Sequence, residues 1–191
     1  MQVECCAPCN NGASLDEEYF ACLIECVLVG STEVEKIARE NVQRSLARNE
    51  KLRAHLESSR SEINGQTLFQ PEGERVKRVL LKTARAPAKY ENSEPKWENP
   101  THFSVRTLPA MDESEREEFF SPRSVTELAS WPEVGSRAMQ RMAFALGNEA
   151  IEYPWVTVQN GNYAFAVTDD VWNPLVKIVI RDYLAVEIGW E

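Results

Sequence analysis

An Asn-Gly pair between two strand-like segments near the C-terminus is the strongest constraint that this sequence places on its fold. Asn160-Gly161 separates residues 155–159 (WVTVQ) from residues 162–167 (NYAFAV), and both segments contain β-branched and aromatic residues. Asn and Gly tolerate the positive φ angles of a type I′ turn, whose twist matches that of a two-stranded β-hairpin. Two later segments rich in Val, Ile and aromatic residues predict one or two further strands: 175–180 and 183–190. We therefore expect an antiparallel sheet at this end of the chain.

The first 60 residues carry a helical pattern instead. Ser14 and Glu17 have the spacing of a capping box, which predicts the start of a helix. Apolar residues then recur on one helical face until Gly30, where we expect this helix to end. A less regular apolar stripe over residues 32–58 predicts a second and longer helix. Together the two helices predict an antiparallel helical hairpin.

The middle of the chain is expected to connect these two regions. Residues 58–73 are polar and contain Gly and Pro, which indicates a linker. Residues 74–85 predict a third helix that Pro87 ends, because proline lacks the backbone N–H and clashes with the preceding turn. Farther along, residues 102–108 alternate as a strand does, and the acidic residues 111–128 predict a short helix without buried side chains.

These elements predict an α+β fold, with an N-terminal helical hairpin followed by helices and a C-terminal antiparallel β-sheet. We expect two domains. Residues 1–60 hold the cysteine-rich start and the helical hairpin, and residues 74–191 form an α+β domain with a C-terminal β-meander. Residues 136–146 fit a helix or a strand, and the sequence leaves both alternatives open.

The composition is that of an ordinary globular protein, with 43% hydrophobic and 27% charged residues. No stretch approaches the roughly 20 apolar residues that a membrane span requires. The N-terminus lacks a basic segment followed by an apolar one, so we expect no secretion signal, no membrane contact and a cytoplasmic location. The net charge of −9 argues against a protein that coats nucleic acid non-specifically, because phosphate contact needs Lys and Arg.

The charge is unevenly distributed along the chain. Residues 30–91 hold 13 basic and 9 acidic residues, whereas the segments on either side are acidic. Within this region Arg44, Arg48 and Lys51 lie on one face of the predicted helix and alternate with glutamates. Residues 30–91 therefore either contact nucleic acid or form a solvated helix surface. The overall acidity favours a protein partner over DNA.

The five cysteines all lie within the first 26 residues, which argues against a secreted disulfide framework. Cys6 and Cys9 have the two-residue spacing of a zinc knuckle, in which a tight turn directs both thiolates to one metal ion. Cys5 is adjacent and is an alternative to one of them. Cys22 and Cys26 lie one helical turn apart among apolar residues. They supply either further zinc ligands or small core side chains, and we favour the core.

Other residues with reactive side chains allow competing interpretations. His55 and His102 have no neighbouring carboxylate in the sequence, so we expect them to be structural. The acidic run Asp16, Glu17 and Glu18 either holds a divalent metal ion or complements the dipole of a helix's first turn, and we favour the second. Residues 131–137, with Trp131 and Arg137, either line a pocket together with Arg141 or form a connector.

The chain resembles a group of bacterial proteins described as HNH endonuclease-like. The resemblance lies in five segments: CAPCNNGASLDEEYF, RVLLKTARAPAKYE, WPEVGSRAMQR, WVTVQNGNYAF and IVIRDYLAVEIGWE. It implies that Cys6 and Cys9 form the second zinc knuckle of the nuclease motif. It also implies that Asn10 occupies the terminal Asn position of the metal site, with Asn11 adjacent to it. A structural zinc ion follows from the resemblance, and a divalent metal ion would serve catalysis.

The chain departs from the family pattern in its first half. It has no first CxxC knuckle and no histidine before His55, so the acid–His or Glu–His pair that would activate water is missing. We therefore expect an HNH-related protein without a complete catalytic site, either as part of a longer protein or as a non-catalytic form. The alternative hypothesis is a protein-interaction or regulatory module without nucleic-acid chemistry.

Overall fold

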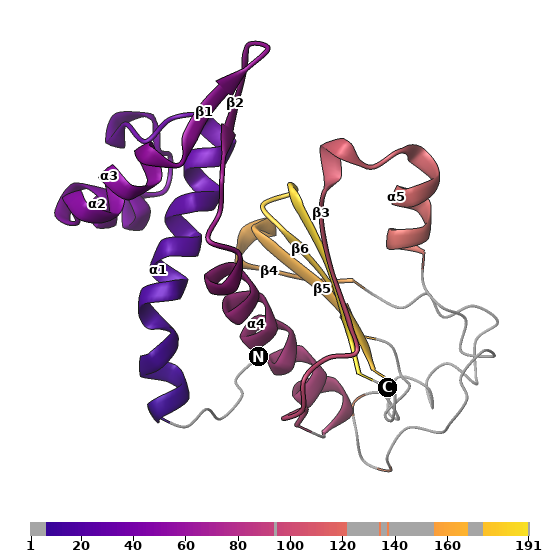
Figure 1. Cartoon of the computed structure of the whole chain (residues 1–191). Helices are drawn as coiled ribbons and strands as arrows, with labels where there is room; N and C mark the ends of the chain where they lie inside the picture. The colour runs from indigo at the N-terminus through magenta and orange to yellow at the C-terminus, as the bar shows by residue number, and fades with distance from the viewer. Residues whose placement is uncertain are drawn as a thin grey trace. The chain divides into compact units, whose positions relative to one another are not determined.

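The computed structural model describes residues 7–93, 95–121, 134, 137, 155–167 and 174–190, and it describes side chains from Gly12 onward (Figure 1). Cys5 and Cys6 lie outside the described residues, as do Trp131 and Arg141. The same holds for the ambiguous segment 136–146, except for Arg137. No helix in the described ranges is long and apolar enough to cross a bilayer.

The first element is helix α1 (Ala7–Val29), which begins seven residues before the predicted start at Ser14. The predicted capping box is therefore wrong, because Ser14 lies inside the helix. Pro8 suits the first turn, where backbone N–H groups have no partner within the helix. The predicted end is confirmed: Gly30 has a φ of 66°, and the N–H of Ser31 donates to the carbonyl of Cys26 at 3.1 Å. This bond is part of a Schellman motif.

The predicted second helix is broken into three shorter elements: η1 (Val34–Lys36), α2 (Glu40–Arg48) and α3 (Glu50–Ser58). The break between α2 and α3 falls at Asn49, whose φ of −111° and ψ of 78° are not helical. The Asn49 side-chain oxygen accepts a hydrogen bond from the N–H of Leu52 at 3.1 Å and so caps the start of α3. Asn is one of the preferred residues at this position.

The predicted linker 58–73 contains a β-hairpin, so that prediction is wrong. Strand β1 (Arg60–Ile63) pairs with strand β2 (Gln66–Phe69) in antiparallel register. The turn between them is Asn64-Gly65, with φ angles of 53° and 76°. This is the same dipeptide signal that predicts the C-terminal hairpin.

Residues 5–80 form one compact unit with its own core. Side chains of α1 meet those of η1's C-cap, α2 and α3, and Phe69 of β2 packs against the same cluster. The fully or nearly fully buried members are Tyr19, Cys22, Leu23, Cys26, Ile37, Val42, Leu46, Leu52 and Leu56. The α1 members recur at i, i+3, i+4 and i+7, which is one helical face. The structure thus confirms Cys22 and Cys26 as core residues.

Helix α4 (Gly73–Asn92) starts where predicted but does not end at Pro87. The chain divides into its two units inside this helix, between Leu80 and Leu81. Proline removes one hydrogen bond from the helix. Ala88 beyond it is completely buried, so tertiary packing after the proline offsets that loss.

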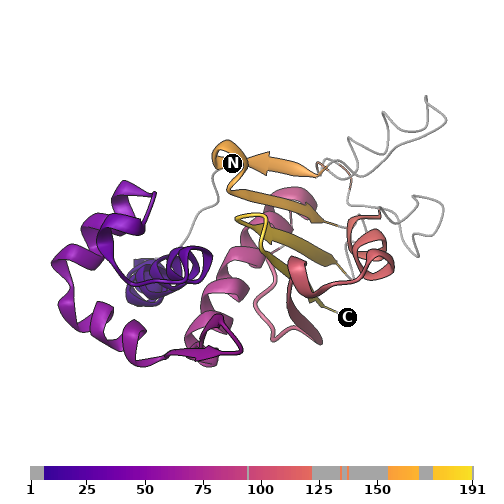
Figure 2. The same cartoon turned by 90° about the horizontal axis from the view of Figure 1, so that it is seen from above.

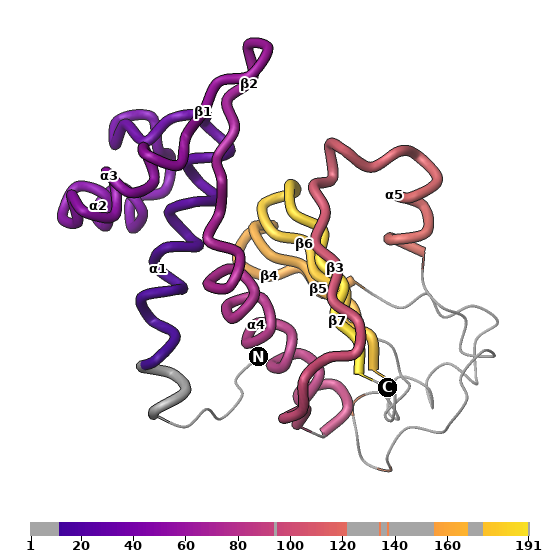
Figure 3. Tube along the Cα trace, in the orientation of Figure 1, coloured from indigo at the N-terminus to yellow at the C-terminus, as the bar shows by residue number. Residues whose placement is uncertain are grey.

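The second unit, from Leu81 onward, is built on a five-stranded sheet (Figure 3). The strands are β3 (His102–Thr107), β4 (Val156–Val158), β5 (Tyr163–Val167), β6 (Leu175–Ile180) and β7 (Leu184–Gly189). Their order is β3-β7-β6-β5-β4, and every neighbouring pair is antiparallel. The predicted α+β class with a C-terminal antiparallel sheet is confirmed.

The predicted type I′ turn is also present, between β4 and β5 in the short element η4 (Gln159–Gly161). Asn160 and Gly161 have φ angles of 55° and 85°. The N–H of Asn162 donates to the carbonyl of Gln159 at 3.2 Å, which closes the turn. This closure brings Val158 opposite Tyr163.

Helix α5 (Glu113–Phe120) and the preceding η2 (Leu108–Ala110) cover one face of the sheet. Phe119 is 1% exposed and packs with Val179 and Ala185 of the sheet, so the prediction of a helix without buried residues is wrong. The part of α4 from Leu81 onward lies on the opposite side of the sheet from α5 (Figure 2). The sheet face that points away from α5 is apolar and buried, with Phe165, Val176, Ile178, Val186 and Ile188.

Candidate functional site

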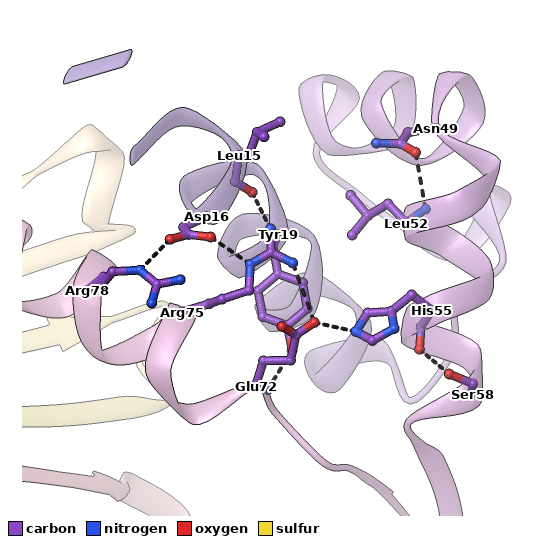
Figure 4. Close-up of polar contacts among 10 residues, drawn as sticks. All are labelled: Leu15, Asp16, Tyr19, Asn49, Leu52, His55, Ser58, Glu72, Arg75 and Arg78. Carbon is purple, nitrogen blue, oxygen red and sulfur yellow. Dashed lines mark hydrogen bonds and ion pairs between the residues drawn. The ribbon is translucent and has the colours of Figure 1, made fainter. Parts of the chain in front are cut away.

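A cluster of polar side chains joins α1, α3 and the first turns of α4 within the N-terminal unit (Figure 4). We call this cluster the polar clasp. Its members are Asp16, Tyr19, His55, Glu72, Arg75 and Arg78. Two of its members, Asp16 and His55, are among the residues that the sequence marks as candidates.

Asp16 is the centre of the clasp. Its two carboxylate oxygens accept hydrogen bonds from the Nε atoms of Arg75 and Arg78, at 2.6 and 2.8 Å. The Arg78 bond, followed by the Arg75 bond, holds the pKa of Asp16 below its ordinary value of 3.8. The carboxylate is therefore charged at neutral pH and fully engaged by two guanidinium groups.

Tyr19 is held on both its ring face and its hydroxyl. The hydroxyl accepts a hydrogen bond from the backbone N–H of Glu72 at 2.8 Å. The guanidinium carbon of Arg75 lies 4.3 Å from the centre of the ring, a cation–π contact. Burial raises the pKa of Tyr19, so the phenol stays neutral and acts as an acceptor.

His55 contacts a carboxylate that lies far from it in sequence. Its Nε2 lies 2.5 Å from Oε1 of Glu72, and the same oxygen lies 3.4 Å from Arg75. Glu72 is 17 residues away and belongs to the segment predicted as a linker, so the sequence does not place it beside His55. Both side chains are about half exposed, so solvent screens the pair.

The acidic run at 16–18 does not lie in the first turn of a helix, because α1 begins at Ala7. The interpretation as a complement to the helix dipole is therefore wrong. Glu18 accepts a hydrogen bond from the hydroxyl of Ser45 and lies 3.6 Å from Arg48. These contacts tie α1 to α2, as the Asp16 contacts tie α1 to α4.

The two cysteines whose side chains are described are buried and therefore unreactive. Cys22 and Cys26 are free thiols with 1% or less of their surface exposed. Burial raises the pKa of Cys22 to about 11 and that of Cys26 to about 12. They are thus protonated at neutral pH and serve the core.

The predicted knuckle residues are placed only in part. Cys9 and Asn10 lie in the first turns of α1, where the backbone is helical. Among the residues whose side chains are described, no three of His, Cys, Asp or Glu gather closely enough to hold a metal ion. The zinc site at Cys6 and Cys9 and the role of Asn10 stay predictions.

Four cations project from α2 and α3: Arg44, Arg48, Lys51 and Arg53. All four are exposed. Arg44 donates to the carbonyl of Glu40 at 3.3 Å, and Arg48 pairs with Glu18. Within the described part of the chain, Lys51 and Arg53 contact no acidic side chain. Arg44, Arg48 and Lys51 are the residues predicted to share one face of a single helix; that prediction is wrong, because the break at Asn49 puts Lys51 on α3.

The C-terminal unit contains the other predicted residues. His102 begins β3 and is exposed. The guanidinium of Arg137 lies 4.3 Å from the ring centre of Tyr90. This contact places Arg137 against α4, and it is the described part of the predicted Trp131–Arg141 feature.

Three members of the polar clasp were not among the residues that the sequence marks as candidates: Glu72, Arg75 and Arg78. Arg75 and Arg78 have helical i, i+3 spacing, which predicts that both face the same way. Nothing in the sequence identifies Asp16 as their common partner, since the two segments are 59 residues apart.

No protein family, curated protein or solved structure matches this chain.

Proposed function

We propose that this chain is an HNH-related binding protein whose helices α2 and α3 contact nucleic acid. The observation that carries the proposal is the group of four exposed cations, Arg44, Arg48, Lys51 and Arg53, on two adjacent short helices. Phosphate contacts need exposed Lys and Arg side chains. The surrounding segment 30–91 is the basic part of an otherwise acidic chain.

The core of the N-terminal unit supports this proposal because it orients the two helices. Val42 and Leu46 bury one face of α2, and Leu52 and Leu56 bury one face of α3. Arg44 and Arg48, at i and i+4, then share the face of α2 that points away from the core. The cations therefore project from a packed scaffold, which reduces the entropy lost on binding.

The candidate general bases of the N-terminal unit already have partners within the protein, which favours binding over hydrolysis. Asp16 is engaged by two arginines, Glu18 by Ser45 and Arg48, and His55 by Glu72. Water activation needs a base that can reach the water. In the described part of the N-terminal unit, these candidate bases instead join its helices, so we propose contact with nucleic acid without cleavage.

The test is fluorescence anisotropy of labelled duplex DNA with the full chain at several salt concentrations. Each phosphate contact contributes about −0.9 to the slope of log Kobs against log salt, so four contacts predict a slope of about −4. K51Q/R53Q removes the two cations without acidic partners and should make the slope less negative by about 2. K36Q/R60Q is the matched control, because Lys36 and Arg60 each pair with a glutamate three residues away, at 2.9 and 3.1 Å.

Equal slopes for the two double variants would overturn the proposed surface. Absence of salt-dependent binding by the unmodified chain would overturn nucleic-acid binding altogether. Cleavage of the DNA in Mg²⁺ or Mn²⁺ by purified protein would contradict the proposal of a non-catalytic form.

The HNH relationship has a separate test in the metal content. It rests on the order Cys6-x-x-Cys9-Asn10, and a structural zinc site needs four ligands. Purified full chain should contain zinc, and C6S/C9S should lose it. Absence of zinc from the unmodified chain would overturn the proposed HNH relationship, because that relationship rests on the Cys6–Cys9 knuckle. This result would not depend on the outcome of the DNA-binding experiment.

A further inference from the structure

Helix α5 presents a continuous stripe on the side that points away from the sheet. Glu113, Glu117 and Phe120 have i, i+4 and i+7 spacing and so share one helical face. Phe119, at a neighbouring position, points the other way into the small core beneath the helix. Two acidic side chains are thus followed along the stripe by an aromatic ring.

The exposed ring is held in a defined position. Phe120 is 41% exposed, and its ring centre lies 5.1 Å from that of Phe119 and 5.3 Å from that of Trp155. The indole N–H of Trp155 donates to the carbonyl of Phe120 at 3.4 Å. An aromatic side chain that is already ordered loses little entropy when a partner covers it, which is a property of binding hot spots.

The helix that carries Phe120 is also anchored to the sheet. The ammonium group of Lys177 on β6 donates to the carbonyls of Glu118 and Phe119, at 3.1 and 3.0 Å. A cation at this end of a helix complements the helix dipole. At the other end, Asp112 and Glu115 form a capping box. Both ends of α5 are therefore fixed.

The surroundings of Phe120 are acidic. The sequence of α5, ESEREEFF, has four glutamates and one arginine. Arg116 is directed to the carbonyl of Leu108, at 2.6 Å, and Glu115 pairs with Arg106. Among the described residues, Glu113, Glu117 and Glu118 have no cationic partner. The charge next to the exposed aromatic ring is thus uncompensated and negative.

We propose that α5 and Trp155 form a docking surface for a basic protein segment that carries an apolar anchor. The anchor covers Phe120 and Trp155, while Lys or Arg side chains of the segment meet Glu113 and Glu117. Charge complementarity selects this partner, because the same glutamates repel the phosphates of nucleic acid. The surface belongs to the C-terminal unit and does not depend on the function proposed for α2 and α3.

The test uses the full chain and three fluorescein-labelled 12-residue peptides. The first combines Lys with Leu at helical spacing, the second replaces each Leu by Ser, and the third replaces each Lys by Glu. Anisotropy should show binding of the Lys/Leu peptide, and binding of the other two should be at least tenfold weaker. E113Q/E117Q should weaken binding of the Lys/Leu peptide at least fivefold, and so should F120A.

The matched control is E35Q/E62Q, which removes two exposed acidic residues, one from η1 and one from β1, in the other unit. This control separates the proposed surface from general attraction to an acidic protein, and it should bind like the unmodified chain. E113Q/E117Q leaves Phe120 in place, so it also tests the surface if F120A perturbs the helix. Equal weakening by E35Q/E62Q and E113Q/E117Q would overturn the proposal, as would equal binding of the Ser-substituted peptide. Self-association that is lost in F120A would also overturn it, in favour of a second copy as the partner.

Discussion

Asp16 of α1 and Arg75 of α4 are joined by a 2.6 Å hydrogen bond between a carboxylate oxygen and Nε, across 59 residues of sequence. The second carboxylate oxygen binds Arg78, and Arg75 also covers the ring of Tyr19. The first turns of α4 are thereby tied to the middle of α1.

Asp16→Asn should lower the free energy of unfolding of the N-terminal unit by about 1 kcal/mol, after allowance for the exposure of Arg78. The folded-state pKa of Asp16 lies below 3.8, so the charged pair stabilises the fold at neutral pH. That contribution is lost as the pH falls through the folded-state pKa. Urea unfolding followed by circular dichroism at 222 nm should show the difference at pH 7 and a smaller one at pH 3. Glu35→Gln, an exposed site in η1, is the control that should change little.

Cys22 and Cys26 should be protected from thiol reagents in the folded protein. Their pKa values of about 11 and 12 leave almost no thiolate at pH 8, and burial blocks access. The variant C5S/C6S/C9S leaves these two as the remaining thiols. A disulfide reagent should label it rapidly in guanidinium chloride and at least a hundredfold more slowly without denaturant. Fast labelling of the folded variant would contradict the core assignment.

Substitution of two glycines of the N-terminal unit by alanine should change the free energy of unfolding in opposite directions. Gly30→Ala should destabilise by about 1 kcal/mol, because Gly30 has a φ of 66° that residues with a Cβ rarely adopt. Gly12→Ala should stabilise by about 0.5–1 kcal/mol, because Gly12 lies inside α1 and a Cβ there meets nothing within 4 Å. Thermal unfolding of the two variants side by side checks both values. A change in stability of the same sign in both variants would contradict the end of α1 at Gly30.

Replacement of Phe119 by alanine should reduce stability far more than replacement of Phe120, although the two residues are adjacent. Phe119→Ala should cost about 3–5 kcal/mol, since that side chain is 1% exposed and fills the core under α5. Phe120→Ala should cost less than about 1 kcal/mol, because 41% of that side chain is exposed. Tryptophan fluorescence during denaturation reports on the C-terminal unit through Trp155 and Trp190. Similar losses of stability in the two variants would contradict the assignment of the Phe119 face of α5 to the sheet.

The sequence predicted local features whose causes lie within a few neighbouring residues. The end of α1 at Gly30 and the turn at Asn160-Gly161 follow from backbone preferences that glycine and asparagine carry with them. The strands of the C-terminal sheet were visible from alternation and from β-branched residues. The Asn64-Gly65 turn carried the same signal, but the polar residues around it led to the prediction of a linker.

The candidate site was less accessible from the sequence. Each member of the polar clasp has an ordinary local explanation, such as a solvated helix surface for Arg75 and Arg78 or a lone structural histidine for His55. The feature that distinguishes them is their proximity, with contacts from 2.5 to 2.8 Å between α1, α3 and α4. Such proximity depends on how helices pack, which periodicity does not specify.

The sequence by itself determined where the chain can turn and which faces of its helices and strands must be buried, because dihedral preferences and hydrophobic periodicity act locally. The tertiary structure decided the outcome wherever local preferences were weak or opposed. Burial of Ala88 carries α4 past Pro87, and packing of Phe69 against the core of α1 holds the β1–β2 hairpin. Pairing of Asp16 with Arg75 and Arg78 was decided there too, since an ion pair between distant segments requires that tertiary packing hold their helices side by side.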